Sequence, residues 1–231
     1  YEQPKSGALW ETRMGALVQG ITDNSRGFFG KIPCSFEDNT KPGLPFTDAE
    51  IRVMVAVMAD GHFRGRDSDP RYCSVRVKRA GKIRRLRRLL RNAGIPYNER
   101  ESDSGYTYFE FLAPEKNKDY SGWWAANNHE LHIVRDECVY WDGSHGRSDR
   151  FFTSIKSVAD FMQYVGAATG YKTSVYCHDR IGASHSDSSY VYKTLEFSVH
   201  FQKSSPYHGF RRGGGPKPRV EHIKEEREYC F

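Results

Sequence analysis

The 231-residue sequence lacks the patterns that mark membrane and secreted proteins. No apolar run approaches the roughly 20 residues that a membrane-spanning helix needs. The first residues, YEQPKSGALW, do not show the charged and then apolar order of a signal peptide. We therefore expect a cytoplasmic protein. The sequence does not begin with Met, so it is readable as a fragment of a longer chain.

Cysteine is scarce and unevenly placed, which argues against a structural zinc site or a disulfide framework. Cysteine stands only at positions 34, 73, 138, 177 and 230, an odd number without any C-x-x-C pair. This usage favours a reducing compartment. The run from His129 to His132, H-E-L-H, lacks the H-E-x-x-H spacing of a zinc protease and fits the first turn of a helix.

Acidic residues are absent from one long basic segment. Residues 71–91, RYCSVRVKRAGKIRRLRRLLR, contain ten Lys and Arg and no Asp or Glu, in a chain of net charge +6. A polyanion such as nucleic acid is one partner that this segment indicates. A solvated basic helix face explains the charge alone equally well.

Residues 47–113 alternate between helix-like and strand-like periods. T-D-A-E at 47–50 has the form of a capping box, and an apolar helix over 48–60 should end at Gly61, the residue that favours a left-handed helix end. Alternation predicts strands at 74–78 and 106–111. A second helix is expected over 82–93.

The same order returns after a connector at 114–128. A helix is predicted over 129–141, followed by Asp142 and Gly143, a strand at 150–155, and a helix over 156–168. Strands are predicted around 173–176 and over 191–201. The two Asp-Gly endings are offset by 82 residues (142 minus 60), and repetition at this scale predicts a pseudo-twofold pair of halves, 47–113 and 129–203.

An aspartate at the C-terminal end of a helix has the wrong sign for the helix dipole, by about 0.3–1 kcal/mol. Asp60 and Asp142 both stand at such an end. A divalent cation would make each acid useful, because carboxylate and helix carbonyl oxygens are the hard ligands that Mg²⁺ prefers. Each aspartate alone is also explained by an ordinary Asp-Gly turn; the repetition favours metal binding by both.

The stretches V-M-V-A-V-M-A-D-G at 53–61 and R-D-E-C-V-Y-W-D-G at 135–143 resemble the motifs of the LAGLIDADG homing endonucleases. The Asp-Gly endings match, as do the small residues Ala56, Ala59 and Cys138. The resemblance covers about 47–203. It implies an α/β (α+β) fold of two αββαββ halves related by a pseudo-twofold axis, with two antiparallel DNA-binding sheets. It also implies a monomer that acts as a pseudo-dimer.

The resemblance further implies a Mg²⁺-dependent endonuclease that cuts both strands of double-stranded DNA across the minor groove, at a long target site. Asp60 and Asp142, with the backbone carbonyls of Ala59 and Trp141, would hold Mg²⁺, or Mn²⁺, or Ca²⁺ in a non-cleaving complex. A basic residue near the scissile phosphate matches Lys78 or Lys82 in the first half, and the sequence does not choose between them. Lys156 matches in the second half.

DNA contacts are expected from the solvent faces of the two sheets and from neighbouring loops, because Arg and Lys bind phosphates and Arg also reads guanine edges. The candidates are Arg64, Arg66, Arg71, Arg76, Lys78, Tyr106, Tyr108, Arg147, Arg150, Lys172, Tyr192, Lys193 and His200. Much of the run Arg84, Arg85, Arg87 and Arg88 is expected to be solvated outer surface.

The two ends of the chain resemble a phage-type intein around an inserted endonuclease. Residues 1–46 contain I-P-C-S-F before a Pro- and Gly-rich loop, and 204–231 end in RVEHIKEEREYCF, similar to the resumption of a splicing domain. A phage or bacterial origin is therefore expected. The splicing Cys or Ser at the N-terminus and the C-terminal His-Asn are absent. The alternative function is a maturase-like or degenerate nucleic-acid-binding module that no longer cleaves.

Overall fold

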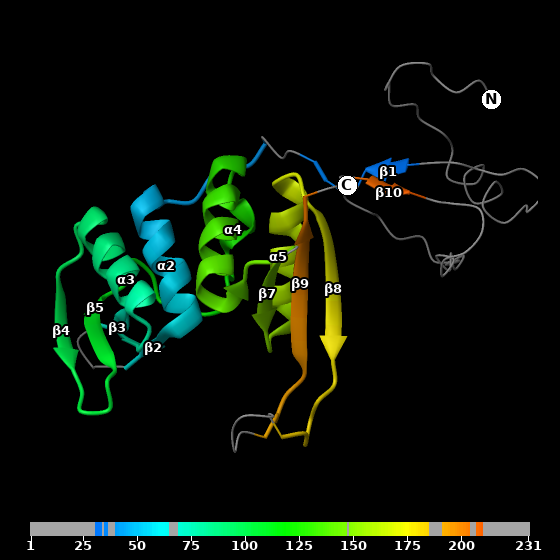
Figure 1. Cartoon of the computed structure of the whole chain (residues 1–231). Helices are drawn as coiled ribbons and strands as arrows, with labels where there is room; N and C mark the ends of the chain where they lie inside the picture. The colour runs from blue at the N-terminus through cyan, green and yellow to red at the C-terminus, as the bar shows by residue number, and fades with distance from the viewer. Residues whose placement is uncertain are drawn as a thin grey trace, which may run out of the picture. The chain divides into compact units, whose positions relative to one another are not determined.

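The structure is a computed structural model that describes residues 31–33, 35–36, 40–64, 69–146, 148–184, 191–203 and 207–209 (Figure 1). The chain divides into two compact units, residues 1–32 with 208–231, and residues 33–207. The short strands β1 (Lys31–Pro33) and β10 (Tyr207–Gly209) pair in a two-stranded sheet. The larger unit contains the repeated halves.

The first half consists of two helices and a four-stranded antiparallel sheet. Its elements are α2 (Asp48–Asp60), β2 (Gly61–Phe63), β3 (Tyr72–Val77), α3 (Ala80–Asn92), β4 (Tyr97–Glu101) and β5 (Thr107–Leu112). The strand order is β2-β3-β5-β4, and every neighbouring pair is antiparallel.

A connector with a short 3-10 turn, η1 (Trp123–Ala125), leads into the second half. Its elements are α4 (Asn128–Asp142), β6 (Gly143–Ser144), β7 (Asp149–Thr153), α5 (Lys156–Ala168), β8 (Lys172–His178) and β9 (Glu196–Gln202). The strand order β6-β7-β9-β8 repeats that of the first sheet. The predicted fold of two αββαββ halves with antiparallel sheets is therefore confirmed.

Both long apolar helices begin with a capping box. In α2 the Glu50 amide donates to the Thr47 hydroxyl at 3.3 Å, and the Thr47 amide donates to the Glu50 carboxylate at 2.8 Å. In α4 the corresponding bonds join Asn127 and Glu130 at 3.0 and 2.9 Å. These bonds satisfy amides that have no partner within the helix, so the two repeated helices start by the same local chemistry.

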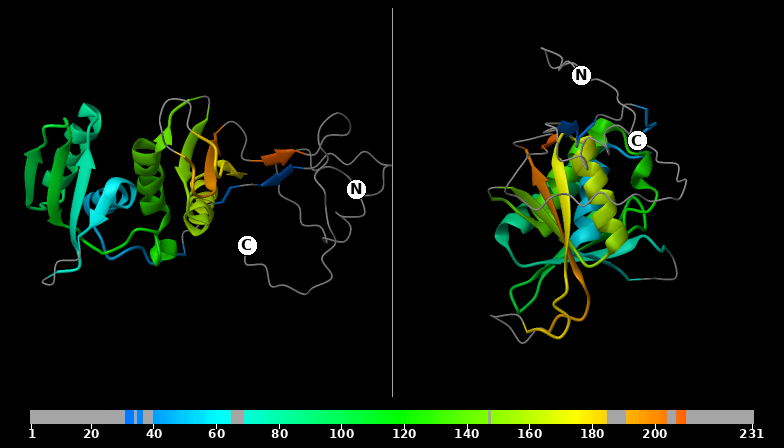
Figure 2. Two further views of the ribbon diagram at one scale, coloured as in Figure 1. Left: turned by 90° about the horizontal axis from the view of Figure 1, so that it is seen from below. Right: turned by 90° about the vertical axis from the view of Figure 1, so that its right-hand side faces the viewer.

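The helices α2 and α4 pack against each other between the two sheets (Figure 2). The sequence predicted an apolar helix over 48–60, and burial in α2 is continuous from Val53 to Met58. The reason is that α2 contacts α4 on one side and α3 with β3 on another. A helix enclosed in this way has no face left for solvent between Val53 and Met58.

The elements of the two halves differ from the predicted ones in several places. The short strands β2 and β6 were not predicted, and the two largest differences concern β4 and β9. Strand β4, whose sequence is Y-N-E-R-E, was not predicted, because a charged edge strand shows no apolar alternation. The predicted strand over 191–201 is too early: β9 begins at Glu196, and Val191 and Leu195 are exposed. Tyr192 and Lys193 therefore precede the sheet instead of lying on its face.

The chain leaves α2 and α4 in extended conformation, so the prediction of a left-handed helix end at Gly61 is wrong. Gly61 has φ −85° and Gly143 has φ −125°. Glycine is needed at both positions because neighbouring backbone atoms leave no space for a Cβ atom. A Cβ on Gly61 would lie 2.5 Å from the Val57 carbonyl oxygen, and one on Gly143 would lie 2.2 Å from that of Arg150. Each glycine lets the following strand begin directly at the helix end.

Among the residues described, no helix has the length and apolar character that crossing a membrane requires.

Candidate active site

The two motif aspartates lie at the same end of the paired helices. Asp60 is the last residue of α2 and Asp142 is the last residue of α4. Burial raises the pKa of the Asp142 carboxyl to about 6, and the negative charge of Asp60 adds to the rise. The ammonium groups of Lys82 and Lys118 oppose it. The two acids and two lysines thus form one electrostatic cluster.

Lys82 is the lysine of the first half that reaches an aspartate. Its ammonium lies 2.6 Å from the Asp60 carboxylate and 5.4 Å from the centre of the Trp141 ring. Both side chains of the ion pair are partly shielded from solvent, at 19% and 28% exposure, so water screens the pair only in part. Lys78 instead lies 5.4 Å over the Tyr106 ring, on the sheet side.

Lys118, in the connector, binds the C-terminal end of α2 and was not predicted. Its ammonium donates to the carbonyl oxygens of Val57, Met58 and Gly61 at 2.9, 2.6 and 2.8 Å. Burial lowers the pKa of Lys118, while the charges of Asp142 and Asp60 raise it. The sequence offers no periodic signal for this contact, because Lys118 lies in a loop and reaches back about 60 residues.

Lys156, the predicted counterpart in the second half, begins α5 and pairs with Asp160 one turn later. Both side chains are well exposed, at 60% and 44%. Since Lys156 is not among the groups that shift the pKa of Asp142, the two halves are not equivalent. The lysines that act on the aspartate pair, Lys82 and Lys118, both come from the first half and its connector.

The oxygen donors at this cluster fit a hard divalent cation. Mg²⁺ is commonly held by one or two carboxylates together with waters and substrate phosphate, and the two mutually repelling carboxylates match that requirement. The predicted carbonyls belong to Ala59, which is partly buried, and Trp141, which is buried. Within the described part of the chain, no group of three or more His, Cys, Asp and Glu side chains forms a ligand cluster.

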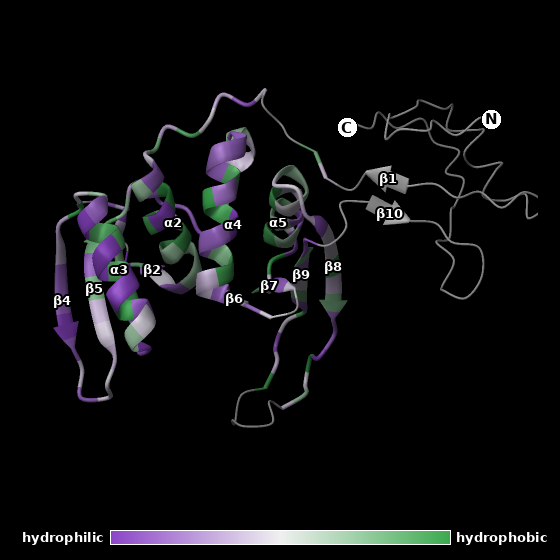
Figure 3. Cartoon of the chain, turned by 45° about the horizontal axis from the view of Figure 1, so that its top comes forward, coloured by the Kyte–Doolittle hydropathy of each residue, from purple (hydrophilic) through white to green (hydrophobic). Residues whose placement is uncertain are grey.

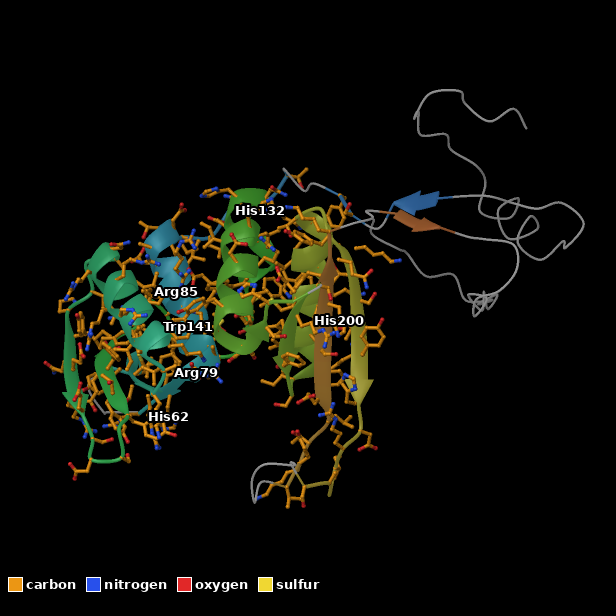
Figure 4. All side chains as sticks on the ribbon, viewed as in Figure 1. His62, Arg79, Arg85, His132, Trp141 and His200 are labelled. Atoms are coloured by element: carbon orange, nitrogen blue, oxygen red, sulfur yellow. The ribbon has the colours of Figure 1, made fainter. Side chains whose placement is uncertain are left out.

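A buried carboxylate beside the site was missed in the sequence. Glu137 of α4 is completely buried. It accepts hydrogen bonds from Arg52 of α2 at 2.9 Å, from Arg85 Nε of α3 at 2.9 Å, and from the Trp141 indole at 3.2 Å. Figure 4 labels Arg85 and Trp141 on their helices. Three helices are therefore joined through one acid, five residues before Asp142. Arg85, expected to be solvated, is part of this network.

The outward face of the first sheet contains stacked cationic and aromatic side chains. Arg76 and Arg100 both lie across from Tyr108 in the strand register. The Arg76 guanidinium lies 3.8 Å over the Tyr106 ring, and that of Arg100 lies 4.4 Å over Tyr108. A guanidinium held over a ring can still donate its N–H groups to phosphates or base edges. Arg100 also forms an ion pair with Glu110 at 3.9 Å, so its guanidinium is partly engaged.

The outward face of the second sheet is richer in histidine. Arg150 lies across from His200 in the strand register. The Ser198 hydroxyl lies 2.9 Å from His178 Nε2 and 3.2 Å from His200 Nε2. Burial, Arg150 and His178 together lower the pKa of His200. The ring centre of Tyr176 lies 4.8 Å from that of His200, with the two rings tilted at 56°, so this face also presents a pair of aromatic rings in contact.

The remaining predicted DNA contacts are divided among several environments. Arg64 pairs with Glu110 at 2.7 Å and Arg71 with Asp69 at 2.8 Å, so neither guanidinium is fully available. Lys172 begins β8, across from Gln202. Arg66 and Arg147 lie outside the described residues, as do most of the two chain ends that resemble an intein.

No known protein-family profile matches the chain. No curated protein matches it either. Several solved structures are similar in fold, three of which follow. A variant of the homing endonuclease I-DmoI, in complex with its target DNA in the presence of Mg, has 8% identity over 67% of this chain and 89% of that chain, with a TM-score of 0.47.

The N-terminal LAGLIDADG domain of DUF199/WhiA has 10% identity over 68% of this chain and 78% of that chain, with a TM-score of 0.44. The homing endonuclease I-WcaI, bound to its DNA recognition sequence, has 11% identity over 67% and 76%, with a TM-score of 0.34. At these identities the likeness concerns the fold alone.

Proposed function

We propose that this chain is a site-specific, divalent-metal-dependent endonuclease of the LAGLIDADG type that cuts double-stranded DNA. One observation supports this most directly: two helices of a repeated unit bring Asp60 and Asp142 into one electrostatic cluster, and the charge of Asp60 helps to raise the pKa of Asp142. Holding two carboxylates near each other is unfavourable unless a cation joins them. A fold that retains this arrangement in both halves is best explained by metal binding.

The DNA would lie along the outward faces of the two sheets, with the aspartate pair between them. Arg76, Arg100 and Arg150 on these faces supply cationic groups for phosphates and guanine edges. Two similar sheets suit a long target site read by a monomer, because each half would contact one half-site. Binding should weaken steeply as salt concentration rises, since phosphate contacts release counterions.

Asp60 and Asp142 would hold Mg²⁺, with Mn²⁺ as a substitute and Ca²⁺ in a complex that does not cleave. When bound, the metal supplies a water of lowered pKa and stabilises charge on the leaving oxygen. The protein groups position the reaction: Lys82 is held beside Asp60 and above Trp141, within reach of negative charge on the scissile phosphate. Lys118 fixes the helix end that presents Asp60.

We further propose that the unit derives from an intein. The strands β1 and β10, which stand on either side of the repeated halves in the sequence, pair with each other. An insertion into a host domain needs its entry and exit segments to lie together, and this pairing supports that origin. The phage or bacterial source and the domain boundaries at 46, 113, 128 and 203 are part of the same proposal.

The second candidate function is a DNA-binding module that has lost cleavage. It is favoured by one specific observation, that two lysines already bind the oxygens at this helix end. The Lys82 ammonium lies 2.6 Å from the Asp60 carboxylate, and the Lys118 ammonium donates to three carbonyl oxygens. Two ammonium groups can substitute for the charge of a metal. The two candidates differ in whether a divalent cation still enters and supports cutting.

The test begins with selection of duplexes from a random DNA library by the protein in Ca²⁺. The selected duplexes are then incubated with the protein in Mg²⁺ or Mn²⁺. Cutting of both strands at one position, abolished by EDTA, is the result expected of the endonuclease. Selection of a sequence that stays uncut in both metals would support the binding module instead. Failure to select any sequence would contradict both.

A further inference from the structure

Helix α3 presents a stripe of arginines that the proposed DNA-cutting site does not use. Arg84, Arg88 and Arg91, hereafter the arginine stripe, are all exposed. Among the described residues none of them forms an ion pair with an acid. Their neighbours do: Arg85 binds the buried Glu137, and Arg87 binds Glu99. The helix therefore neutralises the arginines that face the protein and leaves those that face solvent unpaired.

The spacing of the arginine stripe is that of one helix face. Positions 84, 88 and 91 are four and three residues apart, so they follow one another at about 6 and 4.5 Å along the helix axis. A hollow of 380 Å³ lies against Gly81, Arg84, Arg85, Arg88 and Tyr140. A second one of 530 Å³ lies against Arg84, Arg87, Arg88, Arg91 and Asn92. In Figure 3 the ribbon of α3 alternates between purple, hydrophilic residues and green, hydrophobic ones.

The helix dipole does not explain this arrangement. Arg91 stands in the last turn of α3, where a cation is favourable. Arg84 and Arg88 lie in the middle of the helix, where the dipole has little effect. Like charges at i and i+4 destabilise a helix by about 0.2–0.5 kcal/mol. The repulsion between Arg84 and Arg88 therefore lowers the stability of the helix slightly. Binding of an anionic partner would offset this repulsion.

The arginine stripe and the proposed DNA-reading faces lie on different sides of the first sheet. Glu99 pairs across from the buried Phe109, so its side chain belongs to the face that the helices cover. Arg87 reaches Glu99 from α3, which places α3 over that face. Arg76 and Tyr108, one position out of phase with the buried residues, lie on the other face. A duplex on the outward face is separated from the stripe by the sheet.

We propose that the arginine stripe binds the phosphate backbone of a second DNA duplex, without sequence preference. Guanidinium groups suit phosphate oxygens through paired N–H donors, and a line of them on one helix can follow a backbone. This inference rests on the proposed DNA endonuclease for its role. A protein that holds two duplexes at once can pass from one DNA segment to another while it searches for a rare target site.

The experiment is a bridging assay with the full chain. A biotinylated 30-base-pair duplex of mixed sequence is immobilised, the protein is added at about 50 mM salt, and capture of a second, fluorescent duplex is measured. Wild-type protein should capture the second duplex. The variant Arg84→Gln/Arg88→Gln should lose about tenfold or more of this capture. Its affinity for the first duplex, measured separately, should change less than about threefold.

The matched control is Lys41→Gln/Lys116→Gln, which removes the same charge from two exposed lysines outside α3. It should bridge like wild type. Equal bridging by both variants would overturn the proposal, as would competition by RNA but not by DNA. Wild-type binding of one duplex without bridging would overturn this inference alone. If wild-type protein bound no duplex, the proposed function would fail with it.

Discussion

The ammonium of Lys82 lies 2.6 Å from the carboxylate of Asp60, whereas Asp142 has no lysine partner at hydrogen-bond distance among the described residues. The acid without such a partner is the one whose pKa burial raises to about 6. Pseudo-twofold repetition of the fold therefore does not extend to the chemistry at the helix ends. The two aspartates occupy equivalent positions and unequal environments.

The first prediction concerns the aspartates themselves. Asp60→Asn and Asp142→Asn should each reduce cleavage of the selected duplex in Mg²⁺ by about 10²-fold or more, because each removes a charged metal ligand. Binding in Ca²⁺-free buffer should persist. Asp160→Asn, which removes a half-exposed acid of α5, is the control and should cut normally. Unchanged cutting by both motif variants would exclude this site.

The second prediction separates the lysines that the sequence could not rank. Lys82→Met should lower the single-turnover cleavage rate by about 10²-fold, since its ammonium is held at the aspartate cluster. Lys78→Met and Lys156→Met should leave that rate within about threefold and weaken DNA binding slightly, because each removes only an outlying charge. If Lys78→Met lowered the cleavage rate and Lys82→Met left it unchanged, Lys78 would be the lysine that acts at the scissile phosphate.

Local patterns in the sequence predicted the motif helices well. The capping box at Thr47, the apolar runs and the Asp-Gly endings are each encoded within a few residues, and α5 has the predicted bounds, 156–168. The capping box at Asn127 has the same local form but was not predicted. The duplication then implied that both aspartates share one end. Strand β4 was missed because an exposed edge strand needs no apolar alternation.

The contacts that complete the site could not be predicted, because they join segments far apart in the chain. Lys118 meets the end of α2 from a loop without periodicity, and Glu137 appears in the sequence as one more polar residue of a helix. Its burial follows only once α2, α3 and α4 are packed together. The extended conformation of Gly61 depends likewise on the strand that follows α2.

The third prediction is a pH dependence of stability in metal-free protein. The pKa of Asp142 rises from 3.8 to about 6 on folding, so between about pH 4 and pH 6 the native state retains a proton that the unfolded chain has released. The free energy of unfolding should therefore fall as pH rises through this window, by about 2–3 kcal/mol from this residue.

Asp142→Asn tests this dependence by denaturant unfolding in EDTA. The variant should be more stable than wild type at pH 7.5 by up to about 2–3 kcal/mol and equal to it near pH 4, because the amide never ionises. Asp160→Asn should show no such gain. A motif variant that is less stable at pH 7.5 would contradict the burial of a charged Asp142.

The fourth prediction concerns the buried acid that joins three helices. Glu137→Gln should destabilise the fold by about 3 kcal/mol, because it leaves Arg52 and Arg85 with a neutral partner in a shielded position. Glu99→Gln, which removes the partner of Arg87 at the sheet edge, is the matched control and should cost less than about 1 kcal/mol. Equal losses of stability in the two variants, measured by thermal unfolding, would show that the buried position of Glu137 adds nothing to its contribution.

The last prediction concerns Lys118, whose ammonium binds three carbonyls at the end of α2 and whose pKa responds to the charges of both aspartates. Lys118→Met should raise the pKa of Asp142 further in metal-free protein, because a neighbouring cation that opposes the rise is removed. NMR titration of the Asp142 side chain measures this shift directly.

The Lys118→Met variant should also lose about 1–2 kcal/mol of stability, because the carbonyl oxygens at the end of α2 lose their donor. Lys116→Met, two residues earlier and exposed, should do neither. If Lys118→Met instead lowered the pKa of Asp142, the ammonium could not lie where the hydrogen bonds place it, and the connector would have no part in presenting the acids.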